Sequence, residues 1–494
     1  MFETAELGHT LKKSDYDKQV PELRTRLLTV QRKLRQTGFP VIILISGADG
    51  GGKGEVINLL NEWMDPHYLQ TNAFDEPSDE EKERPEFWRF WRTLPVKGTI
   101  GIYAGSWYSE PLSRRVHRQI NDEQLQIELM HIRQFEQLLI DDGALIIKCW
   151  LHLGRDEQKK RLKKLEKNPK TSWRVTSRDK KHLEMYDDFI DAAEKVLSGT
   201  SIGASPWLII DGTDKHYRRL TAGRHVLDRI SRHIDQRTAD AGVIGKTAAS
   251  AAMDSARPNS LDTLDLSLKL DEKTYHKQLD FYQDKLSKMA RLARQEKRSS
   301  ILVFEGWDAG GKGGAIRRLI HALDARHYRV IPVSAPTDEE RSRHYLWRFW
   351  RHIPRAGNIT IYDRSWYGRV LVERVEGFAA AHEWQRGFSE IVNFEEELMR
   401  DGIIILKFWL HIDKDEQLRR FMARGQISYK RYKLTEDDYR NREKWTEYEL
   451  AANEMIIRTG TQAAPWILVE GNDKKYARIK VLKNYCEKLE SILG

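Results

Sequence analysis

The amino-acid sequence predicts an α/β fold duplicated in tandem, in which each copy holds a parallel sheet with helices on both faces. Three observations lead to this prediction. The chain has 494 residues, more than one domain usually contains. A long internal repeat divides it into two halves. Within each half, apolar runs of strand length alternate with helical patterns.

The internal repeat has an offset of 259 residues. Lys53 matches Lys312 (312 − 53 = 259), and Ser106 matches Ser365 in the same way. Other pairs at this offset are Tyr16 with Tyr275, Trp88–Trp91 with Trp347–Trp350, Trp150–His152 with Trp409–His411, and Pro206–Trp207 with Pro465–Trp466. Near His67 and His327 the offset slips by one residue and then recovers. So long a period indicates a duplicated domain, because each copy can enclose its own core.

The repeat also sets the expected domain boundaries. The first domain covers residues 1–237 and the second covers residues 272–494. Residues 238–271 contain an Ala- and Ser-rich run followed by Pro258, a composition typical of a linker.

Nearly continuous runs of Ile, Val and Leu are typical of strands that are buried on both faces of a parallel sheet. In the first copy these runs are Val41–Ser46, Thr99–Tyr103, Leu145–Leu151 and Trp207–Asp211. In the second copy they are Ile301–Glu305, Ile359–Tyr362, Ile403–Leu410 and Trp466–Glu470. Helical patterns separate them, so a parallel sheet covered on both faces by helices is expected.

A glycine-rich loop follows the first strand of each copy. Residues 306–313 read Gly-Trp-Asp-Ala-Gly-Gly-Lys-Gly, which matches the phosphate-binding pattern G-x-x-x-x-G-K, and a helical stretch, Gly314–Asp324, comes next. Glycines allow backbone N–H groups to surround phosphate oxygens, and the helix N-terminus adds positive potential. The predicted phosphate-binding residues are Gly306, Gly310, Gly311, Gly313, Arg317 and Arg318. The module is therefore expected to be P-loop kinase-like.

Two acids are the candidate metal ligands. Gly313 stands where this pattern usually has a Ser or Thr whose hydroxyl binds Mg²⁺, but Asp308 lies inside the loop. Asp308 is expected to hold Mg²⁺ or to orient the attacking group, and capping of the loop is the alternative. Asp363 ends a second strand, the usual place of a second metal anchor in P-loop proteins. The predicted catalytic residues are Asp308, Lys312, Asp363, Arg364 and Arg369.

These motifs together resemble the polyphosphate kinase 2 family. The resemblance rests on the loop at 306–313, on Pro336–Glu340 and on Asp363–Tyr367, and it covers nearly all of both copies. Two fused copies resemble the subgroup that moves the terminal phosphoryl group of polyphosphate to AMP to give ADP. The resemblance implies a Mg²⁺-dependent phosphotransferase whose partners are polyphosphate and AMP. The residues alone indicate only Mg²⁺-dependent phosphoryl transfer involving an elongated anion.

The resemblance also implies that each copy carries a helical lid; in the second copy the segment from Arg420 to Trp445 would cover the nucleotide. The predicted lid or nucleotide residues are Arg420, Arg424, Lys433, Lys444 and Trp445. Several more basic residues crowd the same stretch, and a solvated face is the alternative interpretation of such a charge run.

The first copy has lost part of this chemistry. It keeps Asp49 and Lys53. The counterparts of Asp363, Arg364, Arg369, Arg424, Lys444 and Trp445 are Ala104, Gly105, Glu110, Leu165, Met185 and Tyr186. Since phosphoryl transfer depends on preorganised positive charge, the first copy is expected to be a catalytically degenerate structural or regulatory partner.

Composition narrows the class of protein further. A net charge of +9 favours an anionic partner. Two cysteines, Cys149 and Cys486, provide neither a disulfide framework nor a zinc motif. Without a signal-like or membrane-spanning segment, the expected location is the cytoplasm, with no membrane or nucleic-acid partner and with self-association into a homo-oligomer. His411 is expected to be a satisfied core histidine. The alternative functions are an ATP-using P-loop kinase and a non-catalytic polyanion-binding protein.

Overall fold

The computed structural model describes residues 1–175, 177–244, 259–426 and 436–494. The chain divides into two compact units. The first unit consists of Met1–Pro77, Arg89–Ala251 and Arg341–His344, and the second of Ser78–Trp88, Ala252–Glu340 and Tyr345–Gly494. Apart from the two short segments, each unit is one half of the sequence.

Each unit contains a five-stranded sheet in which every neighbouring pair of strands is parallel. The first sheet has the order β2-β3-β1-β4-β5, with β1 Val41–Gly47, β2 Leu69–Ala73, β3 Ile100–Ala104, β4 Leu145–His152 and β5 Trp207–Asp211. The second has the order β10-β9-β6-β8-β7, with β6 Ser300–Gly306, β7 Tyr328–Pro332, β8 Ile359–Asp363, β9 Ile404–His411 and β10 Trp466–Glu470. The two sheets share one topology, which confirms the predicted duplication of an α/β fold.

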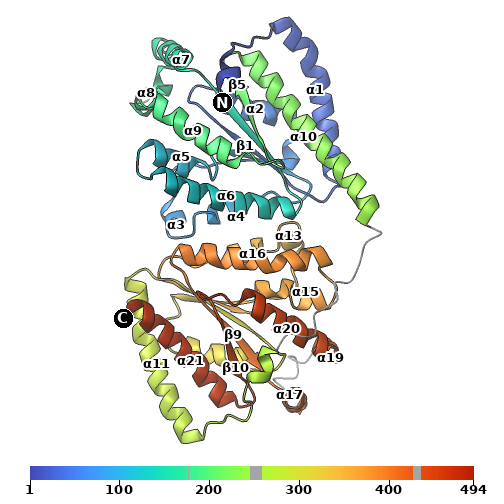
Figure 1. Cartoon of the computed structure of the whole chain (residues 1–494), viewed down its shortest axis with the longest axis vertical. Coiled ribbons are helices and arrows are strands. Elements are labelled where there is room, and N and C mark those ends of the chain that lie inside the picture. Colours follow the sequence, from blue (N-terminus) through green and yellow to red (C-terminus); the bar gives the residue numbers. More distant parts are fainter. Residues whose placement is uncertain (176, 245–258, 427–435) are drawn as a thin grey trace. The chain divides into compact units, whose positions relative to one another are not determined.

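Helices connect the strands and cover both faces of each sheet (Figure 1). The helices of the first half are α1 Lys13–Leu34, α2 Lys53–Trp63, α3 Asp79–Lys82, α4 Trp88–Thr93, α5 Ser109–Val116, α6 Asp122–Asp141, α7 Arg155–Lys167, α8 Ser177–Glu184, α9 Tyr186–Thr200 and α10 Lys215–Ile244. Those of the second half are α11 Glu272–Gln295, α12 Lys312–Ile320, α13 Asp338–Arg341, α14 Trp347–Trp350, α15 Val372–Val375, α16 Ala381–Arg400, α17 Lys414–Gln426, α19 Glu436–Glu443, α20 Trp445–Thr459 and α21 Lys474–Leu493.

The sequence predicted eight of these strands and missed β2 and β7. Both are edge strands. In β2 only Leu69 and Asn72 are buried, and its other residues are exposed. β7 has no fully buried residue. An edge strand with so little burial lacks the continuous apolar run on which the prediction relied.

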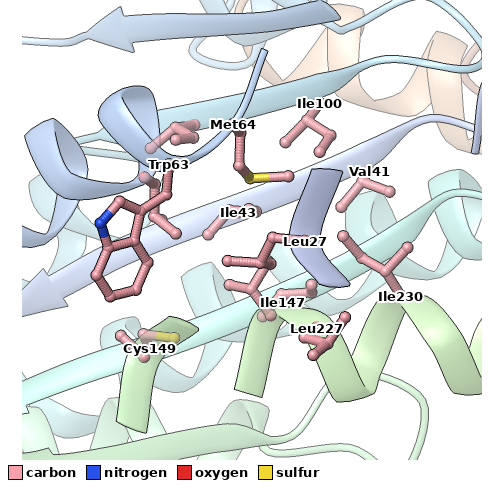
Figure 2. Packing of buried hydrophobic residues seen from close by; sticks show 14 of the residues in the cluster. Leu27, Val41, Ile43, Trp63, Met64, Ile100, Ile147, Cys149, Leu227 and Ile230 are labelled. Carbon is pink, nitrogen blue, oxygen red and sulfur yellow. The ribbon is translucent and has the colours of Figure 1, made fainter. Parts of the chain in front are cut away.

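One cluster of buried apolar residues in each unit lies where a face of the sheet meets the helices packed against it. In the first unit, alternate residues of β1 such as Val41 and Ile43 pack against Leu27 of α1, Trp63 of α2 and Leu227 of α10 (Figure 2). In the second unit, α11, α12 and α21 cover the corresponding face of β6, β8 and β9. These buried strands hold the loop at the carboxyl end of the sheet, where parallel sheets bind their ligands.

A buried ion pair on the opposite face occurs in both units. Lys407 Nζ lies 2.7 Å from Glu395 Oε2 and also donates to the Tyr367 hydroxyl at 3.0 Å and to the Thr459 carbonyl at 2.7 Å. In the first unit, Lys148 makes the corresponding contacts with Glu136, Tyr108 and Thr200. Because both copies keep this network, although the first copy has Ala104 and Gly105 in place of Asp363 and Arg364, we assign the network to the fold.

Among the described residues, no helix combines the length and the apolar character that crossing a bilayer requires.

Candidate functional site

The glycine-rich loop of the second unit runs from the end of β6 to the start of α12. Gly306 has φ 131° and Gly311 has φ 116°, in the left-handed region that favours glycine. A side chain at Gly306 would also collide with the backbone of Leu410 in β9. Glycine at these positions therefore permits both the turn and the close approach of β6 to β9. The N-terminus of α12 faces the loop.

Lys312 starts α12 and curls back over the loop. Its ammonium group donates to the carbonyl oxygens of Gly306 at 2.7 Å and of Trp307 at 3.1 Å. Burial lowers the pKa of Lys312, and the nearby carboxylate of Asp308 opposes that shift. The lysine is thus held at the place where a phosphate chain would enter the loop.

Asp308 lies on the wall of the loop, with both carboxylate oxygens engaged. Oδ1 accepts a hydrogen bond from Arg364 Nη2 at 2.7 Å, and Oδ2 accepts one from Asn441 Nδ2 at 2.9 Å. Burial alone would raise the pKa of Asp308, but the charges of Lys312 and Arg364 outweigh it, so the pKa lies below its ordinary value. Asp308 is therefore an ionised group that links the loop, the end of β8 and helix α19.

Arg364 follows β8 in a strained backbone conformation. Its φ of 65° lies in the left-handed region, where non-glycine residues are uncommon, and its N–H donates to Phe304 of β6 at 3.0 Å. The matching residue of the first unit is Gly105, with φ 78°. Holding an arginine where glycine would be unstrained is typical of a functional constraint.

Asp363, the last residue of β8, completes the pair of acids. It pairs with Phe304 in the sheet register and lines the same cavity as Asp308 and Lys312. No group of three or more candidate ligands (His, Cys, Asp or Glu) occurs in the part of the chain that the structure describes. Two carboxylates still fit Mg²⁺, which uses one or two protein carboxylates and takes its other ligands from water and substrate phosphates.

Glu305 is a functional-site candidate that the sequence did not reveal. It is buried at the end of β6 and accepts a hydrogen bond from the Ser365 hydroxyl at 2.8 Å. Burial raises the pKa of Glu305, although Ser365, Lys312 and Arg364 oppose the shift. A signal was present, since an acid interrupts an otherwise apolar strand and the first copy has Ser46 there. Glu305 places a buried carboxyl group behind the loop, within electrostatic reach of Lys312.

The loop opens into a large basic cavity of about 640 Å³. Among the described residues, those of its lining that are acidic are Asp308, Asp363 and Asp438. The basic residues of its lining are Lys312, Arg317, Arg364, Arg419, Arg420, Arg424, Lys474 and Arg478. Such a surplus of cations over acids favours a ligand with several negative charges.

Arg420 supports the loop from beneath. Its guanidinium is buried and donates to the carbonyl oxygens of Ala309 at 2.8 Å and Gly310 at 3.0 Å, and to those of Gly471 and Asn472. The sequence predicted Arg420 as a lid residue. These bonds instead give it a bracing role in the structure, and its contact with a nucleotide stays a prediction.

The predicted lid residues lie at several places. Arg424 lines the cavity, and Lys444 Nζ lies 3.1 Å from Glu376 Oε1. The Trp445 ring stacks on Trp307 of the loop, with centroids 3.6 Å apart and planes 6° from parallel. Lys433 lies outside the described residues.

Arg318, Arg369 and His411 were also singled out from the sequence. Arg318 does not belong to the lining of the cavity. Arg369 also lies outside that lining, with its guanidinium over the Tyr345 ring and 3.3 Å from Glu373. Their catalytic and phosphate-binding roles stay predictions. His411 is buried and accepts from the Trp307 indole at 3.1 Å, and burial lowers its pKa to about 4, so the predicted core histidine is confirmed.

The loop of the first unit is closed by its own side chains. Lys53 pairs with Asp49 at 3.1 Å, and the other oxygen of Asp49 lies 2.6 Å from His182 Nδ1. The buried Arg218 pairs with Glu55 and packs directly against Gly52 of the loop. The corresponding residues of the second unit are Ala477 (477 − 259 = 218) and Gly314 (314 − 259 = 55), which line its open cavity.

The first unit has Gly105 at the position of Arg364, so replacing Arg364 with glycine tests this difference between the units. Arg364→Gly is expected to lower the kcat of phosphoryl transfer by about 10²- to 10³-fold, because a cation at the cavity is lost. The melting temperature is expected to stay the same or rise, because glycine relieves the strained φ of 65°. Arg364→Lys is the control that keeps the charge. A kcat for Arg364→Gly within threefold of wild type would contradict a catalytic role for this arginine.

Comparisons with known proteins agree with this geometry. The family model described as polyphosphate kinase 2 matches residues 10–238 and again 269–492. The chain is 49% identical over 492 residues to the polyphosphate:AMP phosphotransferase of Pseudomonas aeruginosa, covering 99% of each chain. It is 36% identical over 455 residues to the enzyme of the same name from Acinetobacter johnsonii, covering 91% of each.

A crystal structure of a polyphosphate kinase 2 protein from Pseudomonas aeruginosa superimposes with a TM-score of 0.87 at 46% identity, covering 99% of both chains. The two family matches coincide with the two copies of the repeat. By fold, by loop and by these matches, the chain belongs to the polyphosphate kinase 2 family.

Proposed function

We propose that the second unit transfers the terminal phosphoryl group of polyphosphate to AMP, giving ADP and a polyphosphate shortened by one unit. The observation that carries this proposal is the basic cavity of about 640 Å³ that opens from the loop beside Lys312. A single nucleoside triphosphate would not need so long a lining of cations, whereas an extended polyanion would. The names of the full-length relatives support the same substrates.

The phosphate chain is proposed to lie along the cavity with its end in the loop. Lys312 and Arg364 neutralise oxygens of the terminal phosphoryl group, and Arg424 and Arg478 neutralise phosphates further along. Asp308 and Asp363 would hold Mg²⁺. To bind the ion, the carboxylate of Asp308 would have to give up its hydrogen bonds from Arg364 and Asn441. When bound, Mg²⁺ supplies positive charge that offsets the charge developing on the transferred group.

The transfer itself needs no covalent intermediate. A phosphate oxygen of AMP forms a bond to the terminal phosphorus, and the bond from that phosphorus to the bridging oxygen of the polyphosphate breaks. The phosphate of AMP is already anionic, so no strong general base is required. Lys444 and Trp445, at the start of α20, are proposed to bound the acceptor beneath the lid. Self-association of the chain and its location in the cytoplasm remain predictions.

A donor assay tests this proposal. Purified full chain with Mg²⁺ and AMP is expected to form ADP from polyphosphate at a rate at least tenfold above that with ATP at equal phosphate concentration. Omission of Mg²⁺ is the control, because it separates catalysis from anion binding. A preference for ATP would overturn the donor assignment. Tight binding of polyphosphate without any ADP would favour a non-catalytic polyanion-binding protein.

A further inference from the structure

Arg364 stands on a turn that its residue type does not favour. Its φ of 65° lies in the left-handed region, where a side chain adds backbone strain. The first unit has Gly105 at this position, with φ 78°, so the turn occurs in both units but only the second places an arginine on it. A strained residue persists when its surroundings hold it in place, so the contacts of this turn show what positions Arg364.

Two hydrogen bonds fasten the turn to β6. The backbone N–H of Arg364 donates to the carbonyl oxygen of Phe304 at 3.0 Å. The hydroxyl of the next residue, Ser365, donates to the carboxyl group of Glu305 at 2.8 Å. Glu305 and Ser365 are both buried, so water does not compete for this bond. Ser365 thus ties the residue that follows Arg364 to the strand that leads into the glycine-rich loop.

The first unit lacks the acid as well as the arginine. Ser46 stands at the position of Glu305 (305 − 259 = 46), and Gly105 stands at that of Arg364 (364 − 259 = 105). Glycine is unstrained in the left-handed region and needs no anchor to stay there. The acid therefore accompanies the arginine: the unit with the strained turn has both, and the unit with the relaxed turn has neither.

Glu305 does not reach the substrate cavity itself. Neither Glu305 nor Ser365 belongs to the lining of the basic cavity, which does include Asp308, Asp363 and Arg364. A residue that binds Mg²⁺ or phosphate there would have to face that lining. Glu305 is therefore suited to act through a neighbouring residue and not on the phosphates directly.

We propose that Glu305 is a positioning residue for phosphoryl transfer, and that its hydrogen bond from Ser365 holds Arg364 in the strained turn with its guanidinium at the cavity. Arg364 Nη2 lies 2.7 Å from Asp308 Oδ1 in this conformation. Without the bond the turn can relax, and a small change of φ displaces the far end of a long side chain from its productive place. The inference rests on the function proposed for the second unit.

Steady-state kinetics of ADP formation by the full chain test this proposal. Glu305→Ser, which introduces the residue of the first unit, and Ser365→Ala, which removes the hydroxyl donor, are each expected to lower kcat by about 10- to 100-fold. The KM for AMP is expected to stay within about twofold, because only an interaction with the transferred group is weakened. Glu305→Gln keeps an oxygen that accepts from Ser365 and removes only the charge, so its kcat is expected to stay within about threefold of wild type.

A double-mutant cycle with Arg364→Gly distinguishes positioning of the arginine from a general structural role. Once residue 364 is glycine, no arginine remains to be held, so adding Glu305→Ser is expected to change kcat by less than about twofold. A purely structural role would lower kcat by the same factor in both backgrounds, which would overturn the proposal. It would also be overturned if Glu305→Gln lost as much activity as Glu305→Ser, because the charge and not the hydrogen bond would then be responsible.

Ser106→Ala is the matched control in the first unit. Ser106 and Ser365 each accept a hydrogen bond from the backbone N–H two residues on, at 3.4 Å and 3.3 Å, so both alanine variants lose this shared bond. Ser106→Ala is expected to leave kcat unchanged; a loss equal to that of Ser365→Ala would assign the serine to the shared fold and overturn the proposal. Melting temperatures check the folding of each variant. All rates are ratios to wild type with the donor that wild type uses, so a wrong donor assignment would leave this test intact.

Discussion

Replacing Lys312 with alanine is expected to lower the kcat for ADP formation by about 10³-fold or more. The carbonyl oxygens of Gly306 and Trp307 hold the ammonium group over the loop, and alanine would leave no charge at that position. Removal of one preorganised charged donor at a transferring group costs about 10²- to 10³-fold, and the loss should be at the upper end here because burial strengthens the interaction.

Initial rates at saturating AMP and polyphosphate give this value, with thermal unfolding as the check on folding. Lys312→Arg is the matched control, because it keeps the charge but changes the shape of the donor. It should recover only part of the activity. A kcat for Lys312→Ala within tenfold of wild type would show that the lysine does not act on the transferred group.

Replacing Lys407 with methionine is expected to destabilise the second unit by about 3–5 kcal/mol, because Glu395 would be left as an unpaired charge in the core. Equilibrium unfolding in denaturant measures the loss. The double variant Lys407→Met/Glu395→Gln should recover much of it, because no buried charge remains while the side-chain amide oxygen can still accept from Tyr367 and Trp366.

Lys148→Met in the first unit is the matched experiment, since Lys148 and Glu136 form the same buried pair. It should destabilise the first unit to a similar degree. If Lys407→Met left unfolding unchanged but abolished ADP formation, the assignment of this network to the fold would be wrong.

Much of the fold could be predicted from the sequence because its strongest signals are local. Buried parallel strands such as β1 and β9 appear as unbroken apolar runs, and the loop at 306–313 has a fixed spacing. The edge strands β2 and β7 escaped prediction because their side chains are only partly buried. Their place in the sheet depends on pairing with β3 and β8, a long-range interaction.

The candidate site was predictable in its charged residues and not in their partners. The motifs singled out Asp308, Lys312 and Asp363, and the structure places all three in the lining of one cavity. The motifs could not reveal that Asn441, far along the chain, donates a hydrogen bond to Asp308. The loss of Arg364 from the first copy was visible in the sequence, but the closure of that copy's loop by Arg218 and Glu55 was not. Such contacts depend on the tertiary structure.

We propose that phosphoryl transfer takes place in the second unit alone. The most direct test of this claim is the kcat of Lys53→Ala, measured beside that of Lys312→Ala in the same ADP-forming assay. Lys53 starts the matching helix of the first unit and is neutralised there by Asp49. We expect Lys53→Ala to keep at least half of the wild-type rate while Lys312→Ala loses nearly all of it. Equal losses in the two variants would contradict the claim.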